Sequence, residues 1–420
     1  MYALVDCNNF YASCERLFQP RLDNRAIVVL SNNDGCAIAR SDEAKALGIE
    51  MGTPSFMMED IIKKHNVAIF SSNYTLYGDL SDRVMKTLAG LVPRLEVYSI
   101  DESFLDLSDM LYTDLAMLGV DIKETVRRNV GIPVSVGIAQ TKTLAKMANR
   151  YAKKRYKALG VFYAANQQLI DEMLEFTEVG DIWGVGRQYA NLLQRNGCKT
   201  AMDVTKLPED FMRTKMTVVG QRLWNELRGV PSIEWEFEPP AKKNICTSRS
   251  FGKLTANLSI LKEAASNYTA ACGEKLRRQN SCAKAINVYV TTNYHKPDLP
   301  QYTGSISLEF ETPTNLTGEM ISYALKGLDI IYKEGYLFKK VGITVLGLIP
   351  ENLIQSSMFD VKDRKKEKDI LLSMDKINRL MGKDSVRMAS QGFHRRYKLR
   401  AEHLSNKYTT NINEILKVKN

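Results

Sequence analysis

The sequence predicts a multidomain protein of the α+β class, and three observations support this prediction. The chain has 420 residues, more than one hydrophobic core normally organises, so we expect two to four domains. Alternating apolar and polar runs, typical of strands, occur in both halves and are separated by amphipathic helical segments. A proline-bounded acidic stretch, Pro231 to Pro240, followed by Lys242 and Lys243, indicates an exposed linker between them.

The composition excludes several classes of protein. No run of 18 or more apolar residues occurs, and the N-terminus has no visible signal peptide, so we expect a cytoplasmic protein without membrane contact. Seven scattered cysteines without a Cys-x-x-Cys pair indicate reduced thiols rather than disulfides or a zinc site. Four dispersed histidines offer little material for a histidine metal site or a Ser-His-Asp hydrolase.

Two acidic clusters give the strongest indication of chemistry. Asp6 ends the apolar strand pattern of Met1–Val5, and Asp101-Glu102 lies within a second predicted strand, Leu95–Leu107. If the strands are neighbours, three carboxylates converge, and such a group repels itself unless cations such as Mg²⁺ hold it. A pair of these ions is typical of phosphoryl or nucleotidyl transfer. An isolated Ile-Asp-Glu is more often a solvated turn, but an early aspartate and a later basic helix favour the metal site.

The sequence predicts that residues 20–70 form a small α/β insert between the two acidic strands. Its expected elements are a strand at Ala26–Leu30, a tight turn at Asn32–Gly35, a returning strand at Cys36–Ala39, and a helix from Ser41 as N-cap to Gly48. Arg40 and Lys45 project from this insert. Both side chains are able to reach a triphosphate, although ordinary surface charges would look the same.

A strand followed by a basic helix is expected after the second acidic cluster. The sequence predicts a helix at Asp79–Leu91. It also predicts a strand at Val134–Ile138 that leads into a helix at 140–154. One face of that last helix carries Lys142, Lys146, Arg150 and Lys153, and no acidic residue occurs from 141 to 157. Such a face suits an anionic partner.

Two further segments predict contacts with nucleic acid. Gly184 and Gly186, after Trp183 and before a basic helix starting at Arg187, resemble the hairpin of a helix-hairpin-helix. Such hairpins hold phosphates on backbone N–H groups without reading sequence. Beyond the linker, strands at Thr247–Phe251, Ala283–Thr291, Gly304–Glu311 and Lys340–Leu348, with helices at about 259–279 and 317–334, predict a second α+β domain. Its side chains Arg249, Lys253, Lys275, Arg277 and Arg278 are expected to line a groove.

The net charge of +10 is concentrated at the end of the chain. Residues 361–420 hold 16 Lys or Arg against 7 Asp or Glu, which leaves the other residues almost neutral. The body would therefore bind nucleic acid through local patches. The tail is either an accessory binding region or a solvated basic extension.

Several segments together resemble the Y-family translesion DNA polymerases, and within that family the UmuC group. They are Asp6–Glu15, Leu30–Arg40, Glu43–Gly48, Tyr98–Glu102 and Gly137–Lys146. The resemblance covers essentially the whole chain. It implies a right-hand polymerase with palm (1–19 and 71–165), small fingers (20–70), helical thumb (166–232), linker (233–243), little finger (244–350) and a C-terminal accessory region (351–420).

The same resemblance implies roles for individual residues. Asp6, Asp101 and Glu102, with the Cys7 carbonyl, would hold two Mg²⁺ ions. Phe10 and Tyr11 would pack beneath the incoming dNTP, Tyr11 as the steric gate against a ribose 2′-OH. Arg40, Lys45 and Lys153 would contact the triphosphate, although Ser41 and Asp42 stand where relatives often carry Tyr or Asn. Primer-template DNA would lie on the hairpin (Gly184, Gly186, Arg187) and on Arg249, Lys275 and Arg277.

Partners are also implied. Gln355-Ser-Ser-Met358-Phe359 resembles the peptide by which bacterial polymerases bind the sliding clamp, with Ser356 replacing the usual Leu. The basic tail would contact UmuD-type subunits, a RecA filament or DNA. The expected activity is error-prone synthesis past damaged bases, without proofreading, in the SOS response.

Two alternatives remain open from the sequence. A non-catalytic DNA-binding scaffold would recruit repair partners, but it has no need of the three carboxylates. A palm-type nucleotide cyclase would share the carboxylates, but it has no need of a DNA hairpin, a clamp-like peptide or a basic tail.

Overall fold

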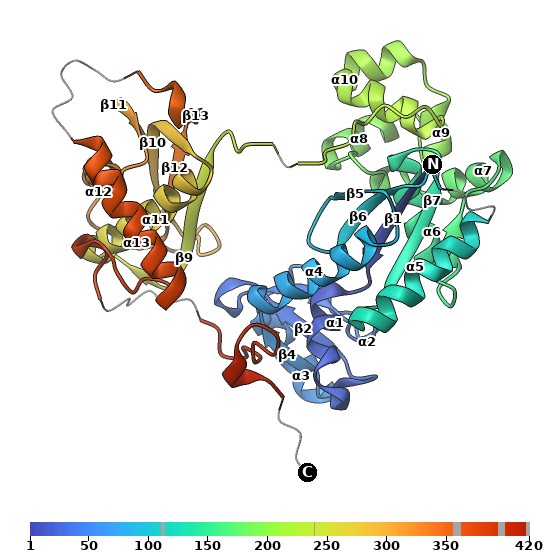
Figure 1. Ribbon diagram of the computed structural model, residues 1–420, viewed down its shortest axis with the longest axis horizontal. Coiled ribbons are helices and arrows are strands. Elements are labelled where there is room, and N and C mark those ends of the chain that lie inside the picture. The colour runs from blue at the N-terminus through green and yellow to red at the C-terminus, as the bar shows by residue number, and fades with distance from the viewer. Residues whose placement is uncertain (111–113, 239, 356–362, 394–399, 417–420) are drawn as a thin grey trace. The chain divides into compact units, whose positions relative to one another are not determined.

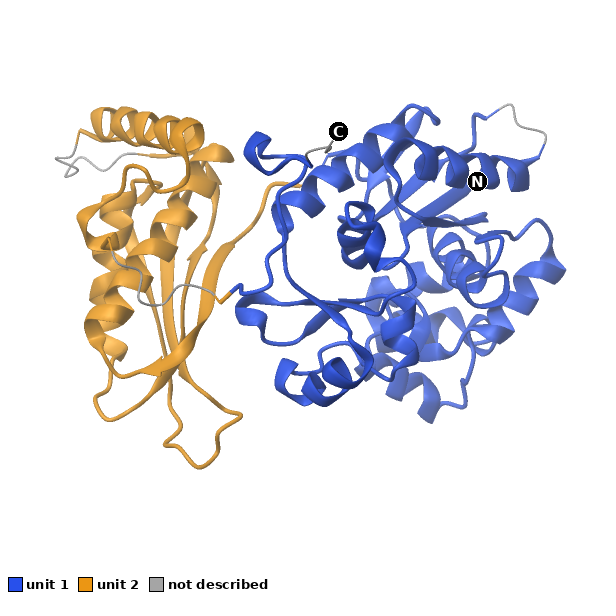
Figure 2. Cartoon of the chain, turned by 90° about the horizontal axis from the view of Figure 1, so that it is seen from below, with its two compact units in different colours: residues 1–239, 401–420 blue, residues 240–400 orange. Residues whose placement is uncertain are grey.

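The computed structural model describes all residues except 111–113, 239, 356–362, 394–399 and 417–420. The chain separates into two units (Figure 2). The first comprises Met1–Pro239 and Ala401–Asn420, and the second comprises Pro240–Arg400. The boundary falls within the predicted linker. The predicted accessory region is divided between the two units, because the chain returns to the first unit at its end.

A five-stranded sheet with the order β5-β6-β1-β7-β8 organises the first unit (Figure 1). Its strands are β1 (Tyr2–Cys7), β5 (Arg94–Val97), β6 (Glu102–Asp106), β7 (Val134–Ala139) and β8 (Val161–Tyr163). Helices cover both faces of this sheet: α1 (Phe10–Leu17), α4 (Tyr74–Ala89) and α5 (Leu115–Val130) on one, α6 (Lys142–Arg155) on the other. Alternate side chains of β1 point to opposite faces of the sheet and belong to two different hydrophobic cores. Leu4 packs with α6, whereas Ala3 and Val5 pack with α4 and α5.

Helix α6 lies unusually close to strand β7. A Cβ atom placed on Gly137 would lie 2.0 Å from the backbone N of Asn149, so only glycine fits there. The Asn149 side chain donates hydrogen bonds to the carbonyls of Leu4, at 3.2 Å, and Ser135, at 2.7 Å. These contacts fix the helix against the centre of the sheet.

A smaller three-stranded sheet, ordered β3-β2-β4, forms from residues 20–70. It consists of β2 (Ile27–Leu30), β3 (Ala37–Arg40) and β4 (Ala68–Ser71), with helices α2 (Asp42–Ala46) and α3 (Glu59–His65). Ser41 is the N-cap of α2, as predicted, and its side chain accepts a hydrogen bond from the Ala44 N–H at 3.4 Å. The predicted tight turn is instead a short 3-10 helix, Asn32–Asp34.

Helices complete the first unit. They are α7 (Gln167–Phe176), α8 (Arg187–Arg195), α9 (Ala201–Thr205) and α10 (Glu209–Leu227), with a 3-10 turn at Val179–Asp181. Their buried side chains share one hydrophobic core with α6, so this helical region packs on the face of the large sheet that α6 covers.

The second unit is an antiparallel sheet with helices on one face. Its strand order is β11-β10-β12-β9, and its core contains residues of helices α11 and α12. The bounds are β9 (Ile245–Thr255), α11 (Leu258–Arg278), β10 (Ser281–Thr292), β11 (Thr303–Thr314), α12 (Thr317–Ile331), β12 (Phe338–Leu346) and β13 (Ile349–Pro350). Helix α13 (Arg364–Met381) follows and buries Leu371.

Some predicted elements were wrong in their bounds. Leu95–Leu107 is not one strand but a β-hairpin, and its turn at Tyr98–Asp101 places Asp101 outside the strand. The helix predicted at Asp79–Leu91 begins five residues earlier, because Asn73 caps it by accepting from the Leu76 N–H. Helix α5 was not predicted.

Two general expectations can be compared with the described residues. All seven cysteines are free thiols. Among the helices of the described part of the chain, none has the length and apolar character to cross a membrane.

Replacing Gly137 by alanine tests the close approach of α6. We expect Gly137→Ala to lower the free energy of unfolding of the first unit by about 1–3 kcal/mol, because the new methyl must displace the helix backbone. Urea unfolding followed by tryptophan fluorescence measures this unit, since Trp183, Trp224 and Trp235 all belong to it. Gly78→Ala is the control, because a Cβ there meets open space. Equal stabilities of the two variants would contradict the assigned contact.

Candidate active site

The turn of the β5–β6 hairpin holds Asp101 in a defined position. The Ser99 hydroxyl donates to the Asp101 carboxylate at 2.6 Å and accepts from the backbone N–H groups of Asp101 and Glu102. The Cys7 N–H donates to the Asp101 carbonyl at 2.8 Å. The turn is therefore tied to the end of β1.

The three acidic residues lie at the same end of the sheet, as predicted. Strands β1 and β6 are antiparallel neighbours, and Asp6 is paired directly with Glu102 in their register. Asp101 precedes Glu102 and is bound to Cys7, the residue after Asp6. Three acidic residues therefore occupy one end of two adjacent strands.

Lysines of α6 neutralise this acidic cluster. Lys153 Nζ lies 2.6 Å from Asp6, and Lys146 Nζ lies 2.8 Å from Glu102. Burial raises the pKa of Asp6 to about 6; the neighbouring Lys153 opposes the shift, and the negative charges of Glu102 and Asp101 add to it. The ammonium groups thus supply the positive charge that a buried acidic cluster needs.

The basic face predicted for α6 is not a free surface. Lys142 is buried and pairs with Glu96 at 2.5 Å, and Arg150 pairs with Asp181. All four side chains of this face pair with acidic residues of the first unit. Lys142 is therefore not available to an anionic partner.

The donor set at the end of β1 and β6 fits Mg²⁺ in its chemistry. Carboxylate oxygens are the hard ligands that this ion prefers, and the lysines already show that positive charge is stable there. Within the described residues, no three acidic, histidine or cysteine side chains are grouped closely enough to hold an ion in their present conformations. Binding of a cation would therefore require Lys153 and Lys146 to release their carboxylates.

An aromatic cluster borders the carboxylates. Helix α1 begins with Phe10 after Asn9, whose left-handed φ of 49° turns the chain sharply. The ring of Tyr11 stacks on Tyr77 with centroids 4.4 Å apart and meets the edge of Tyr74 at 6.0 Å. Burial, with the neighbouring Tyr74 and Asp101, raises the pKa of Tyr11 to about 12. Tyr11 therefore stays a neutral ring beside the acidic cluster.

The other two predicted phosphate contacts already have protein partners. Lys45 donates to Asn9 at 2.5 Å and pairs with Asp42 at 3.2 Å, yet remains about half exposed. Arg40 donates to the Ile49 carbonyl at 2.7 Å. Lys45 keeps access to a ligand, whereas the Arg40 guanidinium is partly committed to the loop that follows α2.

The predicted hairpin presents exposed backbone. Gly184 has a φ of +87°, and neither it nor Gly186 has a neighbouring atom within 4 Å of the position of an added Cβ. Val185 between them is buried, and Arg187 begins α8 with its side chain exposed. The geometry thus leaves room for another backbone, such as a phosphodiester, to approach.

Comparisons with known proteins agree with this arrangement. Residues 5–150 match the impB/mucB/samB family, and residues 242–358 match the C-terminal domain of that family. A solved Y-family DNA polymerase chimera has the same fold with a TM-score of 0.65 at 20% identity, over 83% of this chain and 99% of that one. The chain is 40% identical to protein UmuC of Salmonella typhimurium, over 100% of both. This chain belongs to the UmuC-like Y-family DNA polymerases.

Other relatives are consistent with this membership. Protein MucB of Escherichia coli is 35% identical over 99% of both chains, and DNA polymerase IV of Desulfatibacillum aliphaticivorans is 27% identical over 85% of this chain and 87% of its own. Residues 368–418 match a domain of unknown function. Membership makes the chain a DNA-directed DNA polymerase of the translesion class and confirms the predicted fold class, a right-hand polymerase of mixed α and β structure.

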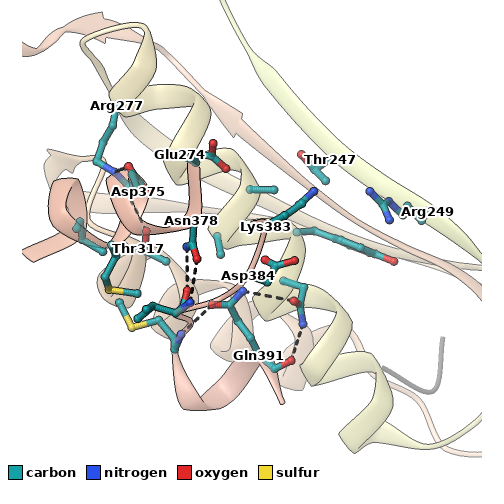
Figure 3. Close-up of a pocket in the computed structure, with 18 residues that line it drawn as sticks. Thr247, Arg249, Glu274, Arg277, Thr317, Asp375, Asn378, Lys383, Asp384 and Gln391 are labelled. Carbon is teal, nitrogen blue, oxygen red and sulfur yellow. Dashed lines mark hydrogen bonds and ion pairs between the residues drawn. The ribbon is translucent and has the colours of Figure 1, made fainter. Parts of the chain in front are cut away.

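One predicted DNA contact of this UmuC-like polymerase is corrected by the structure. Arg277 is buried and forms two hydrogen bonds to the Asp375 carboxylate at 2.7 and 2.9 Å (Figure 3). It also donates to the Asn315 carbonyl and the Thr317 hydroxyl. It joins helices α11 and α13, so it is a structural residue. The helical pattern alone did not show that α13 would cover it.

The other two residues predicted to contact DNA from the second unit, Arg249 and Lys275, have exposed side chains. Arg249 is one of the side chains that line a cavity of about 290 Å³ between β9, α11 and the region of α13 (Figure 3). Lys275 donates to Thr247 at 3.2 Å and is otherwise open to solvent. Both remain candidates for DNA contact. In the clamp-like peptide only Gln355 is described, and Met358 and Phe359 lie outside the described residues.

Sequence reasoning missed the residues that support the site. The Trp183 indole N–H donates a hydrogen bond to the Tyr98 hydroxyl at 3.0 Å. The Lys146 ammonium nitrogen lies 4.6 Å from the centroid of the Tyr98 ring. Glu15 is fully buried and accepts a hydrogen bond from Tyr77 at 2.7 Å. A glutamate on the apolar face of α1 was the one signal in the sequence that pointed to such a network.

Removing the Arg277 side chain tests its structural role. We expect Arg277→Ala to destabilise the second unit by about 2–3 kcal/mol, because it leaves the Asp375 carboxylate partly buried without its partner. Calorimetric unfolding measures this loss, with Arg278→Ala as the matched control on the same helix, since that side chain is exposed and its loss changes stability by about 0.5 kcal/mol or less. Weaker DNA binding at unchanged stability would restore the original prediction.

Proposed function

We propose that this polymerase extends a primer 3′-OH with dNTPs past damaged template bases by two-metal nucleotidyl transfer. The register that pairs Asp6 with Glu102, with Asp101 beside them, carries the proposal. These carboxylates and the Cys7 carbonyl would hold two Mg²⁺ ions. When bound, the ions would activate the attacking hydroxyl and stabilise the leaving pyrophosphate.

The chain's own residues would bind and orient the nucleotide. Phe10 and Tyr11 would support the base and sugar, with Tyr11 as the steric gate. Lys153, once released from Asp6, would contact the triphosphate together with Lys45, and Arg40 would do so by exchanging its bond to the Ile49 carbonyl. Each lysine would thus exchange its carboxylate partner in the free protein for a phosphate group of the bound nucleotide.

Primer-template DNA would be held without reading its sequence. The open backbone at Gly184 and Gly186, with Arg187, supports a phosphate contact from the first unit. Arg249 and Lys275 would add charge from the second unit. Loose geometric checking by small fingers would tolerate damaged bases at the expense of fidelity.

We infer the cellular setting from the UmuC relatives. The polymerase would act in the bacterial cytoplasm during SOS mutagenesis, with UmuD-type subunits and a RecA filament, on the nucleoid. The peptide Gln355–Phe359 would recruit the sliding clamp, Met358 and Phe359 providing its apolar contacts.

Primer extension on an abasic template tests the catalytic assignment. We expect Asp101→Ala to reduce synthesis by at least about 10²–10³-fold, because a ligand of the reacting centre is lost, while primer-template affinity stays within several-fold. Clamp, UmuD-type subunits and RecA filament are added stepwise to find the active assembly. Asp82→Ala, an exposed acid on α4, is the control. Equal loss of binding and synthesis would make the acids structural, and intact binding with no wild-type synthesis in any assembly would favour the scaffold.

Sugar selectivity tests the gate. We expect Tyr11→Ala to raise incorporation of ribonucleotides relative to deoxyribonucleotides by about tenfold or more, because removal of the ring opens space for a 2′-OH. The ratio of kcat/KM for the two sugars with the same base is the measurement. An unchanged ratio would remove the gate assignment.

Deletion of the clamp-like peptide tests recruitment. We expect a chain lacking Gln355–Phe359 to lose stimulation by the clamp and to keep its basal extension rate, because the peptide lies outside the catalytic unit. Stimulation is measured with and without loaded clamp on the same template. Full stimulation of the deletion variant would place the clamp contact elsewhere.

A further inference from the structure

Residues 401–416 belong to the first unit and lie beside strand β4 of the small sheet (Figure 1). His403 and Ser71, the last residue of strand β4, bond one another: the Ser71 N–H donates to the His403 carbonyl at 3.0 Å, and the His403 N–H donates to the Ser71 hydroxyl at 3.0 Å. The Glu402 N–H donates to Asp34 at 2.9 Å. Nearby, Tyr408 stacks on Phe18 of the first unit with centroids 4.7 Å apart.

The docked segment is bound to the start of helix α4. Asn73, the N-cap of this helix, is buried, and its side-chain amide donates to the Ser405 hydroxyl at 3.0 Å and to the carbonyls of Ser405 and Asn406. The first turn of the same helix carries Tyr74 and Tyr77, both of which contact Tyr11. The terminal segment thus holds the helix end that supports the proposed gate.

A series of side-chain contacts, buried at its centre, joins the terminal segment to Tyr11. The Ser405 hydroxyl donates to Glu15 Oε1 at 2.9 Å, and the Tyr77 hydroxyl donates to the same oxygen at 2.7 Å. Glu15 and Tyr77 are completely buried, and Tyr77 stacks on Tyr11 with an interplanar angle of 15°. Every link is a hydrogen bond or a ring stack between neighbours.

Glu15 depends on these two hydroxyls. Its other oxygen, Oε2, has no hydrogen-bond partner among the residues that the structure describes. Burial raises the pKa of Glu15 to about 7, and the hydrogen bonds from Tyr77 and Ser405 partly oppose that shift. Because a buried carboxyl group with few donors is costly, loss of the Ser405 bond favours movement of Glu15 or Tyr77 toward another donor.

We propose that the segment Glu402–Tyr408 is a positioning element for the sugar gate, with Ser405 acting through Glu15 and Tyr77 on the ring of Tyr11. This assigns a role in the catalytic unit to the last part of the region that matches a domain of unknown function. The inference rests on the proposed role of Tyr11 as the gate. None of the positioning residues touches the nucleotide; each holds the next one in place.

The test removes one hydroxyl on each side of Glu15 in the full-length chain. Ser405→Ala and Tyr77→Phe each delete one hydrogen bond, and Tyr77→Phe keeps the stacked ring. We expect each to raise the ribonucleotide-to-deoxyribonucleotide ratio of kcat/KM by about three- to tenfold, the factor that one hydrogen bond supports. Ser405→Thr keeps the hydroxyl and should keep the wild-type ratio. Thr410→Ala, at an exposed position two residues after the segment, should also leave the ratio unchanged.

The outcomes separate this inference from the gate assignment. If Tyr11→Ala itself leaves the ratio unchanged, the gate assignment fails and the inference fails with it. If Tyr11→Ala changes the ratio but Ser405→Ala and Tyr77→Phe do not, only the inference is overturned. A fall in both kcat/KM values at a constant ratio would show that the segment merely stabilises the fold.

A second readout does not depend on activity. With 3-fluorotyrosine placed at position 11, ¹⁹F NMR reports the environment of the ring directly. We expect the resonance to shift or broaden in Ser405→Ala and to remain at the wild-type position in Ser405→Thr and Thr410→Ala. An unshifted resonance in Ser405→Ala would overturn the proposed connection.

Discussion

The structure depends on the neutralisation of a partly buried acidic cluster by lysines of a single helix. Antiparallel pairing places the Cα atoms of Asp6 and Glu102 only about 5 Å apart, and Asp101 follows in the adjoining turn. Like charges at such distances destabilise a fold unless opposite charges lie close to them. Lys153 and Lys146 meet that requirement from one side of the sheet. The same charges therefore stabilise the fold and, under the proposed function, would meet a substrate that carries cations and phosphates.

This arrangement sets strict conditions on helix α6. The helix must lie close enough for lysine side chains to reach the strand ends, and the bare Cα of Gly137 permits that approach. The Asn149 side chain then bonds carbonyls of two strands at once. Lys146 also contacts Tyr98, whose hydroxyl bonds Trp183 just before the glycine hairpin. The acidic site and the hairpin are thus connected through a single lysine within the first unit.

Much of the fold was predictable because periodicity and turn chemistry are local properties. Strands β1 and β7, the four long strands of the second unit, the Ser41 cap and the linker followed from such patterns, whereas β8 was not predicted and β5 and β6 were predicted as one strand. The pairing of Asp6 with Glu102 followed from two similar strands with acidic ends. What the sequence did not reveal was the partner of each charged side chain. Lys142 and Arg277 look like surface charges in a helical pattern, yet both are buried against carboxylates from distant segments. Such pairs arise from tertiary packing, which periodicity does not encode.

The noncontiguous make-up of the first unit has a consequence for how the protein is made. Residues 240–400 form the second unit, and the chain contributes to the first unit again only at Ala401. During synthesis, the ribosome must therefore complete the whole second unit before His403 and Ser405 can reach Ser71 and Asn73. A nascent or proteolytically shortened chain would contain all three carboxylates of the proposed metal site but not the segment that packs beside the aromatic cluster. The first unit can therefore take its full form only after the whole of the second unit has been synthesised.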